Sequence, residues 1–484
     1  SNLPGKNACQ RQTTCGAAPA KFMKAQGLKR MDNKLKNKIK HTVRYLAVDI
    51  LESVENEGAY SNLLLNKVIL SEKLSPKDAG LLTEIVYGVI QRKMTLDYGL
   101  SSYIKDPKKQ LSWLNNLLRV SAYQMVYLTK IPDHAVLFDA VEIAKVKGHA
   151  GIASYVNGVL RNVQRNGLRD WKTISNAKKR ISVGASMPKW LVAYFIERIG
   201  IEETEKMAFS LLEDPFVSLR LQSNEISREE AIGLLKAEGY DVVASPVSPV
   251  GIRIHGGKIV DSPLFKDGML TIQDESSQLV APVGELEKDF LVLDSCAAPG
   301  GKTTHMASYL SASENGKVIA LDMYEHKISL INQNAERLHV SDRIETQVLD
   351  AKEAVHAFAP ESFDVIYVDA PCSGLGLMRR KPEIKYVKNA QDFLDLHQEQ
   401  ILILNSVSSL LKKGGRLVYS TCTLTTEENQ MSVRTFLENH AEFAIVPIRS
   451  EYLDKKSFTA EGFVQIYPHD YGTDGFFISC MVKR

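Results

Sequence analysis

Residues 290–307 read FLVLDSCAAPGGKTTHMA. The apolar run at the start is typical of a buried strand, and the last residues begin a helical pattern. Between them lies a loop of small residues, which lets the backbone approach a ligand, and the next helix offers unpaired amides to a negative group. We therefore predict a loop for a nucleotide-like or carboxylate-bearing ligand, made of Cys296, Ala297, Ala298, Pro299, Gly300, Gly301 and Lys302.

The end of this loop, Gly301-Lys302-Thr303, also matches the end of the phosphate-binding loop of NTPases. That loop needs a glycine five positions before Gly301, and Cys296 stands there instead. An NTPase is therefore a remote alternative, which nucleotide hydrolysis would reveal.

Five apolar strand runs alternate with helical stretches from about residue 286 to the C-terminus. This alternation predicts an α/β domain with a parallel sheet wound by helices on both faces, whose ligands bind at the carboxyl ends of the strands. Functional residues are therefore expected in the loops after the strands. The runs cover residues 290–293, 317–321, 346–349, 365–368 and 416–419.

Three aspartates end successive strand runs of this domain: Asp322, Asp350 and Asp369. Asp322 occupies the place where an acidic side chain accepts hydrogen bonds from ribose hydroxyls in such folds. A single Asp after a strand is most often a cap or turn residue, but three that face one crevice indicate a binding site. No His or Cys accompanies them at ligand spacing, so we assign no metal.

Two cysteines follow the fourth and fifth strand runs. Cys372 lies in Asp369-Ala-Pro-Cys-Ser, and Cys422 lies in Ser420-Thr-Cys-Thr. A free cysteine is usually a buried, inert side chain. Neither of these two sits inside an apolar run, and both are expected at the ligand-binding edge of the sheet, which favours a chemical role.

The remainder of the chain differs from this C-terminal domain. Residues 37–172 have helical apolar spacing, which predicts an all-α domain of six or seven helices. Residues 185–285 mix helical patterns with short alternating runs at 217–221 and 251–254, which predicts a small α+β unit. Residues 1–36 are rich in Lys and Arg and have few periodic apolar positions, so we expect a flexible basic tail, with an RNA-binding arm as the alternative.

The composition sets outer limits on the function. A length of 484 residues predicts about three domains at roughly 150 residues each. Lys plus Arg number 60 and Asp plus Glu 57, so the net charge of +3 does not by itself indicate a nucleic-acid partner. Six cysteines without a Cys-x-x-Cys pair are read as free thiols in a reducing compartment. No apolar run is long enough for a membrane span and no signal peptide opens the chain, so we expect a cytoplasmic protein.

The motifs of the C-terminal half, taken together, resemble a known family. Cys296-Ala-Ala-Pro-Gly-Gly-Lys302, Asp369-Ala-Pro-Cys372-Ser and Thr421-Cys422, in this order, are similar to those of RNA (cytosine-5)-methyltransferases that use S-adenosylmethionine. Tyr155-Val-Asn-Gly-Val-Leu-Arg161 resembles the end of a NusB-like domain. The resemblance to the bacterial 16S ribosomal RNA members covers residues from about 37 onward. It implies a NusB-like domain over 37–172, an RNA-binding or linker domain over 185–285, and a Rossmann-like class I methyltransferase domain over 286–484.

The resemblance also implies a role for each candidate residue. Cys422 would be the nucleophile that adds to carbon 6 of cytosine, Asp369 would activate the ring near nitrogen 3, and Cys372 would assist release of the product. The cofactor would be held by the Cys296 to Lys302 loop, with Asp322 at the ribose, Asp350 near the adenine and Asp369 at the methionine end. Leu349 stands where many relatives have Gly, so the adenine contact departs from the usual pattern.

RNA contacts are expected directly after the second motif. Arg379, Arg380, Lys381 and Lys385 follow Cys372 closely and would hold phosphates that flank an extruded base, although such charges are often only a solvated loop. The implied partner is 16S ribosomal RNA, with no membrane, no metal and a monomeric enzyme. The alternatives are a transfer RNA cytosine-5 methyltransferase and a NusB-like RNA-binding factor without activity.

Overall fold

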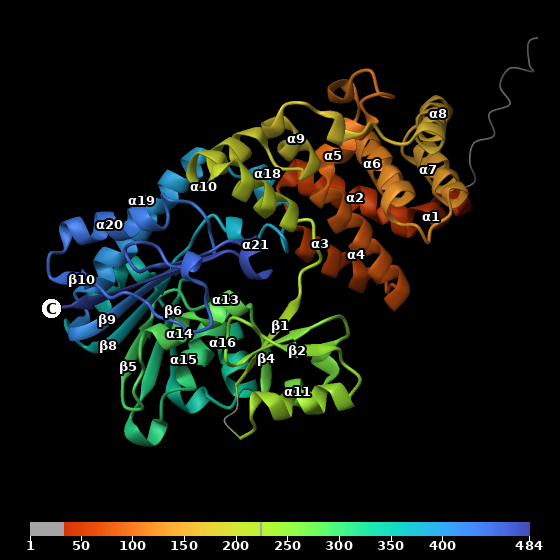
Figure 1. Cartoon of the computed structure of the whole chain (residues 1–484). Helices are drawn as coiled ribbons and strands as arrows, with labels where there is room; N and C mark the ends of the chain where they lie inside the picture. Colours follow the sequence, from red (N-terminus) through yellow and green to blue (C-terminus); the bar gives the residue numbers. More distant parts are fainter. Residues whose placement is uncertain (1–32, 223–224) are drawn as a thin grey trace, which may run out of the picture.

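The computed structural model describes residues 33–222 and 225–484. A helical domain, a small sheet and a larger sheet covered by helices follow one another along the chain, and they lie at the upper right, lower centre and left of Figure 1. The three predicted fold classes are confirmed. Residues 1–32 of the expected basic tail lie outside the described residues. Residues 33–36 belong to helix α1, which begins at Asn33. Within the described ranges, no helix is both long and apolar enough to cross a bilayer.

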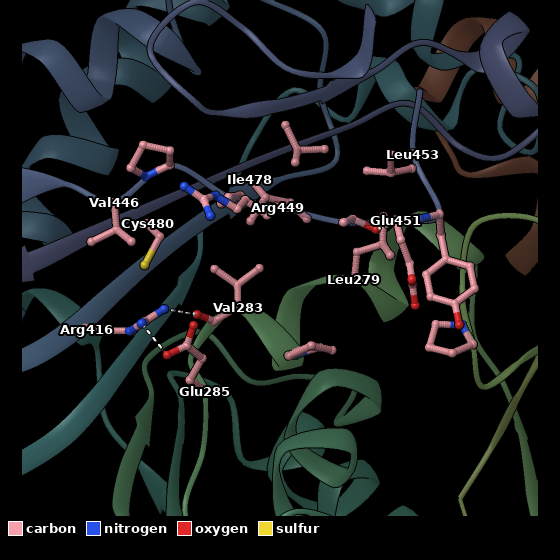
Figure 2. A pocket seen from close by; sticks show the side chains of 17 residues that line it. Leu279, Val283, Glu285, Arg416, Val446, Arg449, Glu451, Leu453, Ile478 and Cys480 are labelled. Carbon is pink, nitrogen blue, oxygen red and sulfur yellow. Dashed lines mark hydrogen bonds and ion pairs between the residues drawn. The ribbon is translucent and has the colours of Figure 1, made fainter. Parts of the chain in front are cut away.

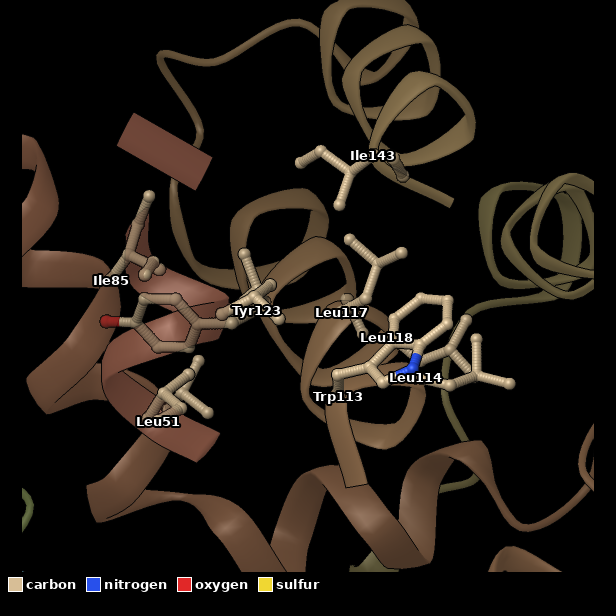
Figure 3. Packing of buried hydrophobic residues seen from close by; sticks show 14 of the residues in the cluster. Leu51, Ile85, Trp113, Leu114, Leu117, Leu118, Tyr123 and Ile143 are labelled. Atoms are coloured by element: carbon tan, nitrogen blue, oxygen red, sulfur yellow. The ribbon is translucent and has the colours of Figure 1, made fainter. Parts of the chain in front are cut away.

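The helical domain is held together by apolar side chains that recur at helical spacing. On α4, Leu82, Ile85, Val86 and Val89 are at most 1% exposed, and Figure 3 shows Ile85 beside side chains of neighbouring helices. Between residues 33 and 166 the structure has eight α-helices, more than the six or seven expected, because α1 and α5 are too short to show a clear period. The helices are α1 (Asn33–Lys40), α2 (Val43–Glu57), α3 (Ser61–Ser71), α4 (Pro76–Gln91), α5 (Lys93–Leu100), α6 (Ser112–Tyr127), α7 (Asp133–Lys147) and α8 (Ala150–Asn166).

The middle unit begins after α9 (Ala177–Gly184) and α10 (Lys189–Ser210). Its four strands form an antiparallel sheet in the order β2-β3-β1-β4, covered by α11 (Arg228–Ala237). The alternating runs of the sequence coincide with β1 (Val217–Leu221) and β3 (Gly251–Ile254), and the shorter β2 (Val242–Ala244) and β4 (Leu270–Ile272) complete the sheet. A capping box between Ser227 and Glu230 fixes the start of α11.

The C-terminal domain is built on an eight-stranded sheet. The five predicted strands are parallel in the order β9-β8-β5-β6-β7: β5 (Leu291–Asp294), β6 (Lys317–Asp322), β7 (Ile344–Val348), β8 (Phe363–Asp369) and β9 (Leu411–Thr421). The expectation of a purely parallel sheet is corrected by β10 (Phe443–Ile445), β11 (Val464–Ile466) and β12 (Phe476–Lys483). β12 runs antiparallel to β9, β10 and β11, which makes the sheet mixed.

Both faces of this sheet are buried, as alternate residues on the strands show. Val292 and Val365 pack with α14, α15 and α16 on one face, whereas Leu293 and Ile366 pack with α19 and α20 on the other. The carboxyl ends of the parallel strands remain free to carry loops. The α-helices that follow β3 in the chain are α12 (Pro263–Lys266), next to β4 of the middle unit, and then α13 (Glu275–Gln278), α14 (Val280–Val283), α15 (Gly301–Ala307), α16 (Glu325–Arg337), α17 (Ala354–Ala357), α18 (Ile384–Val387), α19 (Ala390–Ser408), α20 (Gln430–Asn439) and α21 (Pro468–Tyr471).

Candidate active site

The loop after β5 is held in a conformation that only glycine allows at one position. Gly300 has φ +101° and caps α15, and a Cβ atom there would lie 3.1 Å from the Cα of Ile331. The Ala297 amide donates to the Leu321 carbonyl at 2.9 Å, and the Asn334 side chain donates to the Pro299 carbonyl at 3.0 Å. The loop is therefore fixed against the neighbouring strand β6 and helix α16.

A cavity of about 170 Å³ opens beside this loop. It is lined by Cys296, Ala297, Ala298, Pro299, Gly301, Lys302 and Asp369, and also by Ile272, Gln273, Ser277 and Asp294. The cavity therefore brings six residues of the predicted loop together with Asp369. The other lining residues were not predicted, because they come from the middle unit, from α13 and from the end of the buried strand β5.

Asp294 is the most unusual of these additional residues. Its Oδ2 accepts a hydrogen bond from the Thr303 hydroxyl at 2.6 Å, while its buried Oδ1 has no partner within the described residues. Burial, with the nearby Asp369 carboxylate adding to it, raises the pKa of Asp294 to about 7. A ligand that offers a donor or a positive charge in this cavity would therefore be stabilised.

Asp369 is oriented by two neighbours, one from helix α15 and one from strand β9. The Lys302 ammonium lies 2.8 Å from Asp369 Oδ2, and the Ser420 hydroxyl donates to Oδ1 at 2.8 Å. Lys302 also lies over the ring of Phe476, with its Nζ 5.2 Å from the ring centroid. Because Phe476 lies on the antiparallel strand β12, the unpredicted part of the sheet helps to form the site.

Asp322 and Asp350 lie at the ends of β6 and β7, outside the lining of the small cavity. Asp322 accepts from the Tyr324 amide at 3.1 Å, and Asp350 accepts from the Lys352 amide at 3.0 Å. Both carboxylates therefore act as caps of the turns that follow their strands. Searched over residues 33–222 and 225–484, the chain has no cluster of three or more His, Cys, Asp or Glu side chains that would hold a metal ion.

The two predicted cysteines are neighbours in space. The Sγ atoms of Cys372 and Cys422 are 3.4 Å apart, and both side chains are half-buried. The hydrogen bond with Cys422 and burial raise the pKa of Cys372 well above its usual range. Since two thiolates at this distance would repel each other, loss of the proton from one thiol disfavours its loss from the other.

A buried carboxylate joins the two cysteine loops. Glu428 is 0% exposed and accepts from the Ser373 amide at 2.7 Å, from the Ser373 hydroxyl at 2.5 Å and from the Thr425 hydroxyl at 2.6 Å. The hydroxyls of Ser373 and Thr423 are also 2.6 Å apart. Because Ser373 and Thr423 directly follow Cys372 and Cys422, Glu428 fixes the relative position of the two thiols. Glu428 was not predicted from the sequence, where its only signal is its position three residues after Thr425.

The four basic residues predicted to bind RNA differ in their burial and in their hydrogen-bond and ion-pair partners. Arg379 is 5% exposed and donates to the carbonyls of Ser210 and Pro468 at 3.0 Å, and Lys385 is 1% exposed and donates to the Gln91 carbonyl at 3.0 Å. Both cations are buried between parts of the protein, and their contact with RNA stays a prediction. Arg380 is half-buried and forms ion pairs with Asp274 and Asp474, whereas Lys381 is half-exposed.

A larger cavity of about 910 Å³ lies away from these residues, between the segment 446–453, strand β12 and helix α14. Figure 2 shows Arg416 beside Glu285 in this cavity, with the guanidinium also donating to the Val283 carbonyl at 3.1 Å. None of the predicted catalytic or ligand-binding residues lines it. Cavity size is therefore a poor guide to the site, which is marked by its reactive groups.

Three family models match the chain in the order of its domains. The NusB family matches residues 41–165, and a ferredoxin-like domain of RsmF/B-like methyltransferases matches residues 187–261. The model described as 16S rRNA methyltransferase RsmB/F matches residues 281–482. The last match contains every candidate catalytic residue.

Whole-chain comparisons agree with these matches. A probable ribosomal RNA small subunit methyltransferase B of Bacillus subtilis is 43% identical over 92% of this chain and 99% of that protein, and one of Synechocystis is 31% identical over 91% and 99%. The solved structure of PH0851 has a TM-score of 0.76 at 25% identity and covers 94% of this chain and 100% of its own. The chain therefore belongs to the RsmB/F family of 16S ribosomal RNA methyltransferases, with NusB-family and ferredoxin-like domains preceding the methyltransferase domain.

Proposed function

We propose that the chain transfers a methyl group from S-adenosylmethionine to carbon 5 of a cytosine in 16S ribosomal RNA, through a covalent bond between Cys422 and the base. The observation that carries this proposal is the pair of thiols 3.4 Å apart. Asp369 lines the small cavity and is hydrogen-bonded to Ser420, two residues before Cys422. The names of the relatives support ribosomal RNA as the substrate class.

The residues around the small cavity fit S-adenosylmethionine. Its α-ammonium group would match the unpartnered Oδ1 of Asp294 and the carboxylate of Asp369, and the loop from Cys296 to Lys302 offers backbone at close range. Asp322 and Asp350, at the next two strand ends, would hold the ribose and the adenine. When bound, the cofactor supplies an electrophilic methyl group on a sulfonium.

The first chemical task of the protein is to activate carbon 5 of cytosine, which is a weak nucleophile. The thiolate of Cys422 adds to carbon 6, and the electron pair of the 5,6 double bond then becomes available at carbon 5. Negative charge develops on the ring in this step. Asp369, held by Lys302 and Ser420, would donate a proton to the ring near nitrogen 3, and this proton neutralises the developing charge.

The second task is to remove the proton that remains on carbon 5 after methylation. The hydrogen bond with Cys422 and burial raise the pKa of Cys372, and the contribution of Cys422 requires its sulfur to be free. Once this sulfur is bonded to carbon 6, Cys372 would give its own proton to solvent water and, as a thiolate, accept the carbon 5 proton. The bond between sulfur and carbon 6 then breaks, and Cys422 leaves as a thiolate.

We further propose that the chain acts as a monomer in the cytoplasm, with Arg380 and Lys381 as RNA contacts of the basic segment. A complete set of two thiols, Asp369 and the ligand cavity on one chain supports a monomeric enzyme. The side chain of Lys381 forms no ion pair among the described residues, which leaves its charge available to a phosphate.

The decisive experiment compares Cys372→Ser and Cys422→Ser with substrate RNA and S-adenosylmethionine on denaturing gels. Cys372→Ser is expected to accumulate a protein–RNA band that survives denaturation, because release is blocked after the adduct forms. Cys422→Ser should form no such band, and a band from this variant would reverse the assignment.

Bisulfite sequencing of RNA treated with the wild-type protein would then locate the methylated cytosine. Methylation of transfer RNA in place of 16S ribosomal RNA would support the alternative substrate. A failure to transfer radiolabelled methyl to either RNA would favour an RNA-binding factor without activity.

A further inference from the structure

A third cavity, of about 830 Å³, lies where the three domains meet. We call it the three-domain cleft. One wall comes from α4 and α6 of the helical domain, another from residues 212–215 and Lys258 of the middle unit, and the third from residues 379–382 of the methyltransferase domain. None of the functions derived above uses this cleft as a whole.

The cleft is preformed, because buried polar contacts fix the helical domain against the other two. The amide and hydroxyl of Ser61 donate to Glu383 Oε1 at 3.1 and 2.9 Å, and the Lys385 ammonium donates to the Gln91 carbonyl at 3.0 Å. The side chain of Gln91 in turn donates to the Leu211 carbonyl at 2.7 Å. Separating the domains would leave these buried groups unpaired, which is costly.

The third wall of the cleft starts at the active site. The Gly376 amide donates to the Cys422 carbonyl at 2.9 Å, and the chain runs from there through the short helix 375–377 to Arg379 and Arg380, which line the cleft. An RNA strand whose base reaches Cys422 must continue past one of the walls around it. Because its third wall starts at the active site, the three-domain cleft is one open path for that strand.

The wall formed by α4 and α6 carries groups suited to unpaired nucleotides. The rings of Tyr123 and Tyr127 stack with centroids 5.2 Å apart, and the Arg92 guanidinium carbon lies 4.6 Å from the centroid of Tyr127. Arg92 and the exposed Lys258 form no ion pair with any carboxylate among the described residues. Planar guanidinium groups and tyrosines stack on bases, and unpaired cations bind phosphates.

Two carboxylates also line the cleft, and they restrict what can bind. Glu84 already accepts a hydrogen bond from the Tyr123 hydroxyl at 2.6 Å. Asp214 would repel a phosphate but can accept a hydrogen bond from the amino group of a base. The mixture of one base acceptor, aromatic rings and two unpaired cations favours single-stranded RNA over a duplex, which presents mainly phosphates.

We propose that the three-domain cleft binds the single-stranded RNA next to the target cytosine, with Arg92 and Tyr127 against a base and Lys258 at a phosphate. This inference rests on the proposed function, because it takes the substrate of the two cysteines to be RNA. It gives the helical and middle domains a direct part in substrate binding.

The test measures the affinity of the full chain for a 16S ribosomal RNA transcript at several salt concentrations. Arg92→Gln and Lys258→Glu are expected to raise the Kd at least about tenfold, and each should lower the slope of log affinity against log salt by about one. Lys413→Glu is the matched control, because this exposed lysine lies near the start of β9, whereas Cys422 follows the end of that strand. It should change the Kd less than twofold.

A second measurement does not depend on variants. Photo-crosslinking of the wild-type protein to RNA that contains 4-thiouridine, followed by mass spectrometry, should identify peptides with Arg92, Tyr127 or Lys258. Unchanged RNA affinity in both variants, or crosslinks confined to other surfaces, would overturn the cleft assignment. Binding in the cleft without methyl transfer by the wild type would instead refute the proposed function and leave the cleft assignment standing.

Discussion

Residues 369–373 and residues 379–385, two parts of one segment, are neighbours in sequence, but their side chains lie in different surroundings. The first part faces the ligand cavity with Asp369 and the partner thiol with Cys372. The second part turns the cations of Arg379 and Lys385 into the protein, where backbone carbonyls accept their hydrogen bonds. Reactive groups and positive charges that adjoin a catalytic motif therefore need not serve the same purpose.

This contrast shows what each part of the segment contributes. Substitutions in the first part should remove turnover from a protein that still folds. Substitutions of Arg379 or Lys385 in the second part should lower the stability of the domain arrangement and leave the chemistry of each folded molecule nearly intact. Measurements that separate turnover from stability can therefore confirm or break the comparison.

The largest effect is expected for Cys422→Ser. Loss of the attacking thiolate should lower kcat by at least about 10³-fold, because serine at neutral pH is a far weaker nucleophile without an adjacent base. The melting temperature should stay within about 2 °C of the wild type, since the side chain is half-buried and the change is isosteric. Radiolabelled methyl transfer and thermal unfolding measure both, and retained turnover would contradict the role of Cys422.

The next effect is expected for Glu428→Gln. The amide has no charge and only one acceptor oxygen, so the charge-assisted contacts to Ser373 and Thr425 should weaken, and the relative position of the two thiols should become less well defined. We expect kcat to fall about 10- to 100-fold with little change in the KM for S-adenosylmethionine, as for a positioning residue.

The neighbouring Glu427→Gln is the control for this variant. Glu427 accepts from Arg198 at 2.9 Å and makes no contact with Ser373 or Thr425 among the described residues. A larger change in KM than in kcat for Glu428→Gln, or an equal loss in both variants, would refute the positioning role.

A smaller effect, on stability, is expected for Arg379→Ala. Removing a buried guanidinium leaves several carbonyls unpaired and should lower the free energy of unfolding by about 3 kcal/mol. Lys381→Ala, two residues away and half-exposed, should change it by less than about 0.5 kcal/mol. Denaturant titration distinguishes the two, and equal stability of both variants would break the comparison between the two parts of the segment.

The smallest effect is expected for Lys385→Met, and it depends on pH. Burial lowers the pKa of Lys385 to about 7, so between about pH 7 and pH 10 the unfolded chain binds one more proton at this residue than the folded chain. Wild-type stability should therefore gain about 1–2 kcal/mol from this residue between pH 7.5 and pH 9, and should lose it as the pH falls. Urea unfolding of Lys385→Met at the two pH values should lack this gain, and identical pH dependence in both proteins would argue against a buried, neutral lysine.

Short-range patterns were enough to predict much of this protein. The loop from Cys296 to Lys302 was identified because its small residues follow an apolar strand run directly, and both properties are local. The runs at residues 217–221 and 251–254 coincide with β1 and β3, because alternation along a strand reports burial of one face. The two cysteines were found in the same way, as reactive residues directly after strands.

What only the tertiary structure decided are the contacts between residues far apart in the chain. β12 is antiparallel because it pairs with β9, and no local pattern encodes which neighbour a strand will choose. Glu428 acts on Ser373, and Arg379 is buried because Ser210 and Pro468 surround it. A charged residue has the same appearance in sequence whether it faces water or carbonyl groups. Its role is fixed by desolvation, which depends on the domains that pack around it.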